Sequence, residues 1–377
     1  MLGVAKSTDG CRCRICGSAE SRKISFGSLL VSTESINPTL HAYENHICAG
    51  CGVVFQYPEI SDEVLVRHYN GAYRVSPYAL SMPDKIIDLP VQIPWSGISF
   101  QRFHTFFEMI RRNARQFPNI VPTDKDTIID LGAYQGMFLH AASRTWGCQT
   151  IAYDYNEQGI RFARDALGIT DAKVAHNIYE DQFDEQIRFC ILVHAFEHLR
   201  DPNRFLQHIR KDILRTDGYL YLEVPNVFAS PLSDPTHFFT YSVDSLCFVL
   251  RKNGFEPIDV QVHGHPYLPE LRKSDLLPTF IWQTDAMNIS VIARPTGCTG
   301  SSGLDGKMIN VAALYREIKH GHRRVVWQAV VSQVKRVAIE IARFVYYVVF
   351  VLVLERMSYR VAKTVVKVLR RIIKKGD

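Results

Sequence analysis

Long apolar runs are scarce in this 377-residue chain. The longest, Phe344–Leu354, has 11 residues, whereas a helix that crosses a membrane needs about 18. The N-terminal stretch MLGVAKSTDG also lacks the apolar segment of a signal peptide. These absences lead us to expect a cytoplasmic protein whose thiols stay reduced, so that clustered cysteines indicate metal ligands before disulfides.

Acidic residues are scarce at the C-terminal end. Residues 306–377 contain 16 Lys/Arg and only 4 Asp/Glu, whereas residues 1–305 carry a net charge of −6. The end of the chain also has an apolar stripe at helical spacing, formed by Val361, Val365, Val368 and Ile372. A basic helix with such a stripe suits an anionic membrane surface, so we expect peripheral attachment to the inner face of the membrane. A helical hairpin packed on protein is the alternative, and the apolar density argues against nucleic acid.

Changes in composition divide the chain into five parts. Paired cysteines mark a module at 1–60, and apolar residues at three- and four-residue spacing predict a helical lid or connector at 61–120. Alternating strand and helix patterns fill 121–295. A linker at 296–308, rich in glycine and serine, precedes the basic, proline-free helical tail at 309–377.

Four of the nine cysteines form two Cys-x-x-Cys pairs, Cys13 with Cys16 and Cys48 with Cys51. Two such pairs can hold four thiolates at the corners of a tetrahedron, which structural zinc prefers, and they leave no open position for water. The 31 residues between the pairs can form a small hairpin. We therefore predict a zinc-ribbon-like module with structural Zn2+; unligated thiols or a redox pair are the alternatives.

The stretch DTIIDLGAYQG predicts a buried strand, Thr127–Leu131, followed by a glycine turn and a helix, Met137–Thr145. Glycines let the backbone approach a ligand closely, and the start of a helix offers free N–H groups. The turn lacks the Gly-x-Gly-x-x-Gly pattern that holds a dinucleotide pyrophosphate. A nicotinamide oxidoreductase is therefore a less favoured alternative.

Further strands and helices alternate after this turn. The strand QTIAYD ends at Asp154, whose carboxylate can accept hydrogen bonds from both hydroxyls of a ribose. Five more strands are predicted in DAKVAHN, RFCILV, GYLYLEVPN, FEPIDVQV and NISVIARP. This alternation predicts a Rossmann-like α/β fold, a doubly wound sheet of seven mostly parallel strands with ligands at their carboxyl ends.

The order of these signals resembles that of class I S-adenosylmethionine-dependent methyltransferases. More narrowly, it is similar to a group in which a zinc-binding N-terminal module precedes the core and many members modify sugars. The resemblance covers about residues 11–295. The family's first motif, acid-x-Gly-x-Gly-x-Gly, corresponds here to Asp130, Gly132, Tyr134 and Gly136, so that Tyr134 replaces the middle glycine.

The resemblance implies S-adenosylmethionine as the cofactor, with its amino-acid end held by the glycine turn, including Ala133. Asp154 matches the ribose-binding acid, and Tyr155 follows it. Asn177 and Ile178 match the region beside the adenine. In HAFEHLRDP, His194 is expected beside the cofactor.

The segment HAFEH also fits the His-x-x-Glu-His pattern of some zinc proteases. That chemistry needs two histidines one turn apart on a helix. Here a strand precedes the motif and Pro202 begins a new helix soon after it, so the metalloprotease interpretation is disfavoured.

Methyl transfer to a hydroxyl benefits from a general base, and histidine is the natural choice near neutral pH. His237 in DPTHFFTYS is the first candidate and His198 the second. Related sugar C-methyltransferases often carry Glu-His in a similar segment, whereas Thr236 precedes the histidine here. We therefore expect O-methylation of a sugar or glycan, free, nucleotide-linked or lipid-linked. The alternative is a non-catalytic, membrane-associated zinc scaffold with a degenerate methyltransferase fold.

Overall fold

The computed structural model describes most of the chain up to residue 324. The described residues are 11–31, 39–61, 63–64, 94–183, 187–229, 232, 234–264, 287–296, 309–324 and 327. Two compact units comprise residues 1–323 and 324–377, and nearly all described residues belong to the first. Residues 65–93 of the predicted lid, nearly all of the predicted linker and most of the predicted tail lie outside the described residues.

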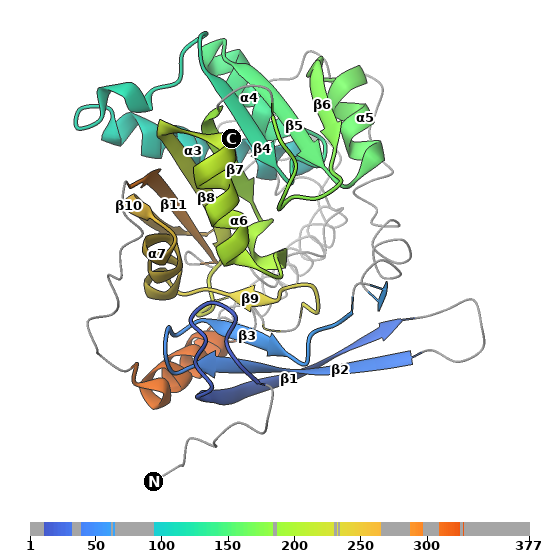
Figure 1. Ribbon diagram of the computed structural model, residues 1–377, viewed down its shortest axis with the longest axis vertical. Helices are drawn as coiled ribbons and strands as arrows, with labels where there is room; N and C mark the ends of the chain where they lie inside the picture. Colours follow the sequence, from blue (N-terminus) through green and yellow to red (C-terminus); the bar gives the residue numbers. More distant parts are fainter. Residues whose placement is uncertain are drawn as a thin grey trace, which may run out of the picture. The chain divides into compact units, whose positions relative to one another are not determined.

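A seven-stranded sheet forms the centre of the first unit (Figure 1). Its strands, in spatial order, are β10 (Phe255–His263), β11 (Asn288–Pro295), β8 (Leu214–Pro225), β7 (Ile187–Val193), β4 (Thr127–Leu131), β5 (Gln149–Asp154) and β6 (Asp171–Val174). One strand, β11, runs opposite to the other six, which are parallel to one another. The predicted Rossmann-like fold is confirmed.

Side chains along the central strands alternate between two buried faces. In β7, Phe189 and Ile191 join one core, whereas Cys190 and Leu192 join the other. The first core includes side chains of α3 (Pro94–Asn113), α4 (Met137–Trp146) and α5 (Glu157–Asp165). The second includes α6 (Pro202–His208), α7 (Val243–Lys252) and the N-terminal cysteines. Burial on both faces explains why strands such as IRFCILV are apolar throughout.

The helix boundaries follow from capping residues. Asp201 accepts a hydrogen bond from the backbone N–H of Arg204 at 2.9 Å, and Pro202 occupies the first turn of α6 as predicted. Ser242 and Ser245 form a reciprocal capping box at the start of α7. Gly147 ends α4 in the left-handed conformation that a C-cap requires.

A second, antiparallel sheet contains the predicted N-terminal hairpin. It consists of β1 (Ser21–Val31), β2 (Thr39–Cys48), β3 (Val54–Tyr57) and the two-residue β9 (Phe239–Thr240), in that order. Figure 1 shows β9 beside β3, although β9 follows β8 in the chain. The sequence analysis did not predict this strand, which joins the cysteine module to the core.

The start of the predicted tail forms a helix over 311–324. The guanidinium of Arg22 lies 4.1 Å from the ring centroid of Tyr315, and His322 Nε2 is 2.9 Å from the carbonyl oxygen of Val227. Among the described residues, no helix is long and apolar enough to span a bilayer. The predicted attachment of the remaining tail to a membrane surface stays a prediction.

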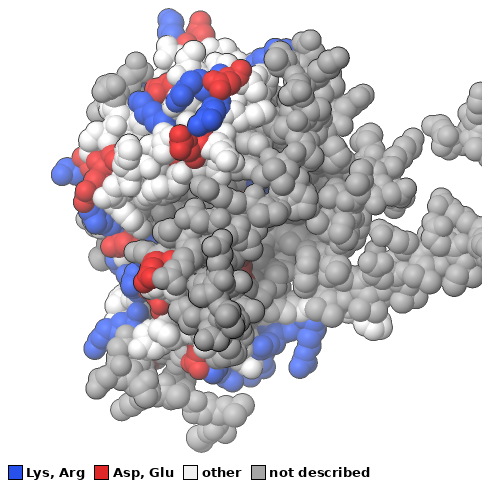
Figure 2. Space-filling view, turned by 90° about the vertical axis from the view of Figure 1, so that its right-hand side faces the viewer, with Lys and Arg blue, Asp and Glu red and all other residues white. Residues whose placement is uncertain are grey.

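Basic and acidic side chains are intermixed over the upper part of the surface in Figure 2. Among the described residues, Arg111 and Glu108 form one ion pair of opposite charges on α3, at 2.7 Å. Such exposed pairs contribute little stability, on the order of 0.2–1 kcal/mol each.

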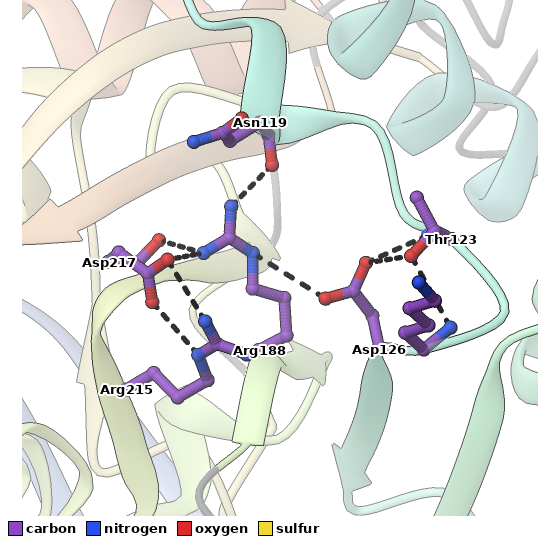
Figure 3. A network of polar contacts seen from close by, with 7 residues as sticks. Asn119, Thr123, Asp126, Arg188, Arg215 and Asp217 are labelled. Atoms are coloured by element: carbon purple, nitrogen blue, oxygen red, sulfur yellow. Dashed lines mark hydrogen bonds and ion pairs between the residues drawn. The ribbon is translucent and has the colours of Figure 1, made fainter.

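A buried arginine links the amino ends of the central strands through hydrogen bonds and ion pairs (Figure 3). Arg188, at the start of β7, is 4% exposed and donates to the carbonyl oxygens of Asp217, at 2.7 Å, and Asn119. Its guanidinium also pairs with the Asp217 carboxylate and lies 3.9 Å from Asp126. Because Arg188 satisfies groups from three segments, its loss would leave several of them unpaired.

We expect Arg188→Met to lower the free energy of unfolding by about 3 kcal/mol, because it removes one partner from a buried charged network. Arg215 pairs with the same Asp217 at 2.9 Å, but its side chain is 41% exposed, so Arg215→Met should cost less than about 1 kcal/mol. Guanidinium chloride unfolding followed by fluorescence measures both variants. Equal losses in the two would contradict this account.

Candidate functional site

The turn after β4 lies at the carboxyl edge of the sheet, where the strand order reverses between β4 and β7. Open α/β sheets bind ligands at such a reversal. Gly132 has a φ of 98°, and a Cβ there would lie 2.8 Å from the Cβ of Ala195. Tyr134, in place of the middle glycine, keeps a left-handed φ of 46°. Such a conformation costs a non-glycine residue about 1–3 kcal/mol and is concentrated at ligand sites.

The predicted ribose acid lies against this turn. Asp154 accepts backbone hydrogen bonds from Tyr134 and Asn156, both at 2.7 Å. A carboxylate offers about four lone-pair sites, so two remain for hydroxyl donors. Burial raises the pKa of Asp154, and these two backbone donors oppose that rise.

The predicted adenine-side residues are close by. The hydroxyl of Tyr155, whose side chain is 60% exposed, accepts the backbone N–H of Ile178 at 3.3 Å. The Asn177 side chain accepts the N–H of Tyr179 at 3.1 Å, which shapes the loop after β6. Tyr134, Asp154, Tyr155 and Ile178 are therefore joined by direct contacts, and Asn177 lies beside Ile178 in the same loop.

Asp130 is buried at the end of β4, and burial together with the charge of Asp154 raises its pKa to about 8. Within the described part of the chain, its Oδ1 atom has no hydrogen-bond partner. A buried carboxyl group without full hydrogen bonding is costly. Its position beside the glycine turn suits a cationic group of a ligand.

A cluster of charged side chains lies at the ends of β7 and β8, on the other side of the strand reversal from Asp130 in β4. His194, directly after β7, has a left-handed φ of 53°, and its Nε2 lies 3.3 Å from Glu223 of β8. Arg102 of α3 lies 3.2 Å from the same carboxylate, which has no exposed surface. Burial would raise the pKa of Glu223, but the hydrogen bond of His194 and the charge of Arg102 hold it at about 2.

The sequence analysis missed Arg102 and Glu223. A single acid within the apolar strand YLYLEVP was a usable signal for Glu223. No comparable signal marks Arg102, because the helical spacing around it predicts packing alone.

The two candidate bases face each other. The His198 and His237 rings are 4.9 Å apart, and Nδ1 of His198 donates to the carbonyl oxygen of Thr236 at 3.0 Å. Nε2 of His237 lies 3.4 Å from Asp234. Burial lowers the pKa of both imidazoles, to about 4 for His198, whereas Asp234 opposes this for His237. Both rings are therefore neutral at pH 7.

Glu197 lies close to this histidine pair and also to His194, the residue expected beside the cofactor. It is fully buried, its carboxylate lies 3.5 Å from Nδ1 of His194, and burial raises its pKa to about 8. The backbone of His194 has a left-handed conformation, and the 3-10 turn η4 (Phe196–His198) follows it. The two histidines of HAFEH therefore do not share a helix. The geometry of a helical zinc protease is therefore not formed here.

The four predicted zinc ligands come together in the N-terminal module. The Sγ atoms of Cys13, Cys16, Cys48 and Cys51 lie within 4.8 Å of one another. Bound to one zinc at about 2.3 Å, tetrahedral sulfurs would be about 3.8 Å apart. The Gly50 N–H already points at Cys48 Sγ, 3.3 Å away. Cys11 is buried nearby but does not belong to this group.

The family of methyltransferase domains matches residues 101–260 of the chain. This part of the chain is a class I methyltransferase domain. An enzyme with this domain takes the transferred methyl group from S-adenosylmethionine, so the corresponding expectations of fold, enzyme class and cofactor are confirmed. No curated protein matches the chain.

Several solved structures are similar to the methyltransferase part. A chain of the complex between the Haloferax volcanii Trm112 methyltransferase activator and a methyltransferase is 17% identical, with 55% of this chain and 100% of that chain covered and a TM-score of 0.40. An Aquifex aeolicus S-adenosylmethionine-dependent methyltransferase is 17% identical, with coverages of 50% and 89% and a TM-score of 0.37. Geranyl diphosphate C-methyltransferase from Streptomyces coelicolor is 14% identical, with coverages of 56% and 89% and a TM-score of 0.38.

The residues of the methyltransferase domain fit the cofactor. S-adenosylmethionine carries a positive sulfonium and a positive ammonium group, and the unsatisfied Oδ1 of Asp130 can pair with a cation. At Gly132 the backbone approaches Ala195 so closely that a side chain would clash. Asp154 keeps acceptor capacity for the ribose. When bound, the cofactor supplies an activated methyl group.

We expect the cofactor-free protein to lose stability as the pH rises from about 4 to 8, by at most about 1.4 kcal/mol per pH unit. The reason is that the folded state raises the pKa of Asp130 from 3.8 to about 8, so it keeps the proton to a higher pH than the unfolded state. Asp130→Asn should remove this component and weaken cofactor binding. Chemical unfolding at several pH values and calorimetry measure the two effects; unchanged profiles and affinity would contradict the assignment.

We expect about one zinc per chain, measured by mass spectrometry of the metal content. Cys48→Ser should release it, because Cys48 supplies one of the four sulfurs. Cys11→Ser is the matched control, since Cys11 does not belong to the group of four sulfurs. Equal zinc in both variants would rule out the four-cysteine site.

Proposed function

We propose that the protein transfers the methyl group of S-adenosylmethionine to a hydroxyl of a sugar or glycan, with His237 as the general base. The observation that carries the proposal is the neutral, partly accessible imidazole of His237, oriented by Asp234 at 3.4 Å. An acid–histidine pair of this kind is a common arrangement for removing a proton from a hydroxyl.

Asp234 supplies the acidic partner of His237 that the sequence does not place directly before the histidine. Thr236, rather than an acid, precedes His237, but the carboxylate three residues before the histidine contacts its ring instead. Thr236 supports that carboxylate, since its hydroxyl donates to Asp234 at 2.6 Å and its N–H at 2.9 Å. The proposed base therefore has its own fixed partner, which favours transfer to oxygen.

A cavity lies beside the two residues that directly follow His237. It has a volume of about 170 Å3, and its lining includes Phe238 and Phe239, which directly follow His237. Arg12, Gln56 and Glu59 add polar groups, and further aromatic rings come from the cysteine module. Sites that combine a few polar groups with aromatic side chains are suited to small polar ligands such as sugars.

The chemistry requires alignment as well as a base. The hydroxyl oxygen must approach the sulfonium methyl in line with the bond that breaks, and its proton passes to His237. Positioning alone can supply several kcal/mol of the barrier reduction. The buried rings of Phe196 and Tyr241 stack at 5.4 Å, which joins the segment that carries His198 to the segment that follows His237.

We expect His237→Gln to reduce the rate of methyl transfer by about 100- to 10,000-fold while leaving the dissociation constant for S-adenosylmethionine unchanged. His104→Gln, on the exposed face of α3, is the matched control and should retain the full rate. Labelled S-adenosylmethionine with free, nucleotide-linked and lipid-linked sugars provides the assay. A wild-type rate in the His237 variant would exclude it as the base, and binding of cofactor without methylation of any sugar would exclude this acceptor class.

A further inference from the structure

Three potential metal ligands meet at the carboxyl end of β7. Glu197, His198 and His237 each present one donor atom, and these atoms lie within 4.8 Å of one another. Three donors bound to one ion at about 2.1 Å lie about 3.0–3.6 Å apart when no two of them are trans. Side-chain shifts of less than about 1 Å would therefore be sufficient to close the site.

The carboxylate of Glu197 lacks the surroundings that a buried charge needs. Glu197 has no exposed surface, and neither of its oxygens has a hydrogen-bond partner in the described part of the chain. Nδ1 of His194 lies 3.5 Å from one of these oxygens. Burial of a carboxylate with so few partners costs several kcal/mol, and a bound cation would offset that cost.

The two imidazoles are oriented as metal ligands usually are. Nδ1 of His198 lies 3.0 Å from a carbonyl oxygen, which can only accept, so this nitrogen carries the hydrogen and Nε2 keeps its lone pair. Nε2 of His237 contacts the Asp234 carboxylate at 3.4 Å, which leaves Nδ1 for a metal. Histidine ligands typically donate their second N–H to a carbonyl or carboxylate in this way.

Ions can reach this cluster from solvent. The side chain of Asp234 is 45% exposed and that of His237 is 17% exposed, whereas Glu197 forms the closed end. A site with one open side leaves coordination positions for water or for an oxygen of the acceptor.

We propose that Glu197, His198 and His237 bind one divalent transition-metal ion, separate from zinc at the four cysteines. Two imidazoles and one carboxylate suit Mn2+, Fe2+ or Zn2+, whereas a set of four thiolates selects zinc. Binding at these residues does not depend on which molecule is methylated. With the ion bound, the Nδ1 lone pair of His237 would be used for coordination, so the ion, by lowering the pKa of a bound hydroxyl, would replace His237 as the group that activates the acceptor.

Mn2+ is a suitable probe because oxygen and nitrogen ligands bind it while thiolates favour zinc. In protein loaded with one equivalent of zinc, which the four thiolates take first, electron paramagnetic resonance should detect loss of the free Mn2+ signal with one Mn2+ bound per chain. Glu197→Gln, which preserves side-chain size, should weaken binding at least tenfold. Glu108→Gln, on the exposed surface of α3, is the matched control and should bind as the wild type does. Equal binding by both variants would overturn the proposal.

Two further measurements keep the result independent of folding and of the acceptor. Asp234→Asn, outside the buried core, should weaken Mn2+ binding about 10- to 100-fold by disturbing the orientation of His237, with an unchanged melting temperature. Anomalous scattering from crystals of the unsubstituted protein soaked in Mn2+ should place the ion between the three side chains. Ions found only elsewhere would overturn the site. Because neither experiment measures methyl transfer, a wrong acceptor or base would not alter their outcome.

Discussion

The reversal of strand order between β4 and β7 is the constraint on which the site depends. Strands on one side continue through β5 and β6, and those on the other through β8, so the loops at their carboxyl ends diverge and leave room for a ligand. The glycine turn, Asp154 and His194 all follow directly from these strand ends. Any register change in β4 or β7 would turn their buried side chains to the opposite face and move the whole set.

The same edge concentrates groups that lower the stability of the ligand-free protein. Asp130 and Glu197 are buried carboxyl groups with raised pKa values, and Tyr134 and His194 hold left-handed backbone conformations. Such features persist where the surrounding fold over-determines them, and they are typical of binding sites. The network around Arg188, at the opposite ends of the strands, supplies stability at a distance from the chemistry.

The cysteine module has a structural connection to the proposed chemistry. Its strand β3 pairs with β9, and the Gln56 side chain donates to the carbonyl oxygen of Pro235 at 3.1 Å. The guanidinium of Arg200 lies 4.4 Å from the ring centroid of Phe238 and pairs with Glu59 of the module. These contacts hold the segment that carries His237 against the cysteine module. A metal at the cysteines would therefore stabilise the position of His237 without touching substrate.

The sequence by itself determined the order of strands and helices, because apolar runs such as TIIDL and IRFCILV, with glycine and proline beside them, reflect local backbone preferences and burial. It also determined the two cysteine pairs, whose spacing is local, and the methyltransferase signals after β4 and β5. Only the tertiary structure decided that β9 joins the cysteine module, that Arg102 neutralises Glu223, and that His198 meets His237. Each of these contacts joins residues far apart in the chain, and such contacts depend on how whole layers pack, which local spacing does not encode.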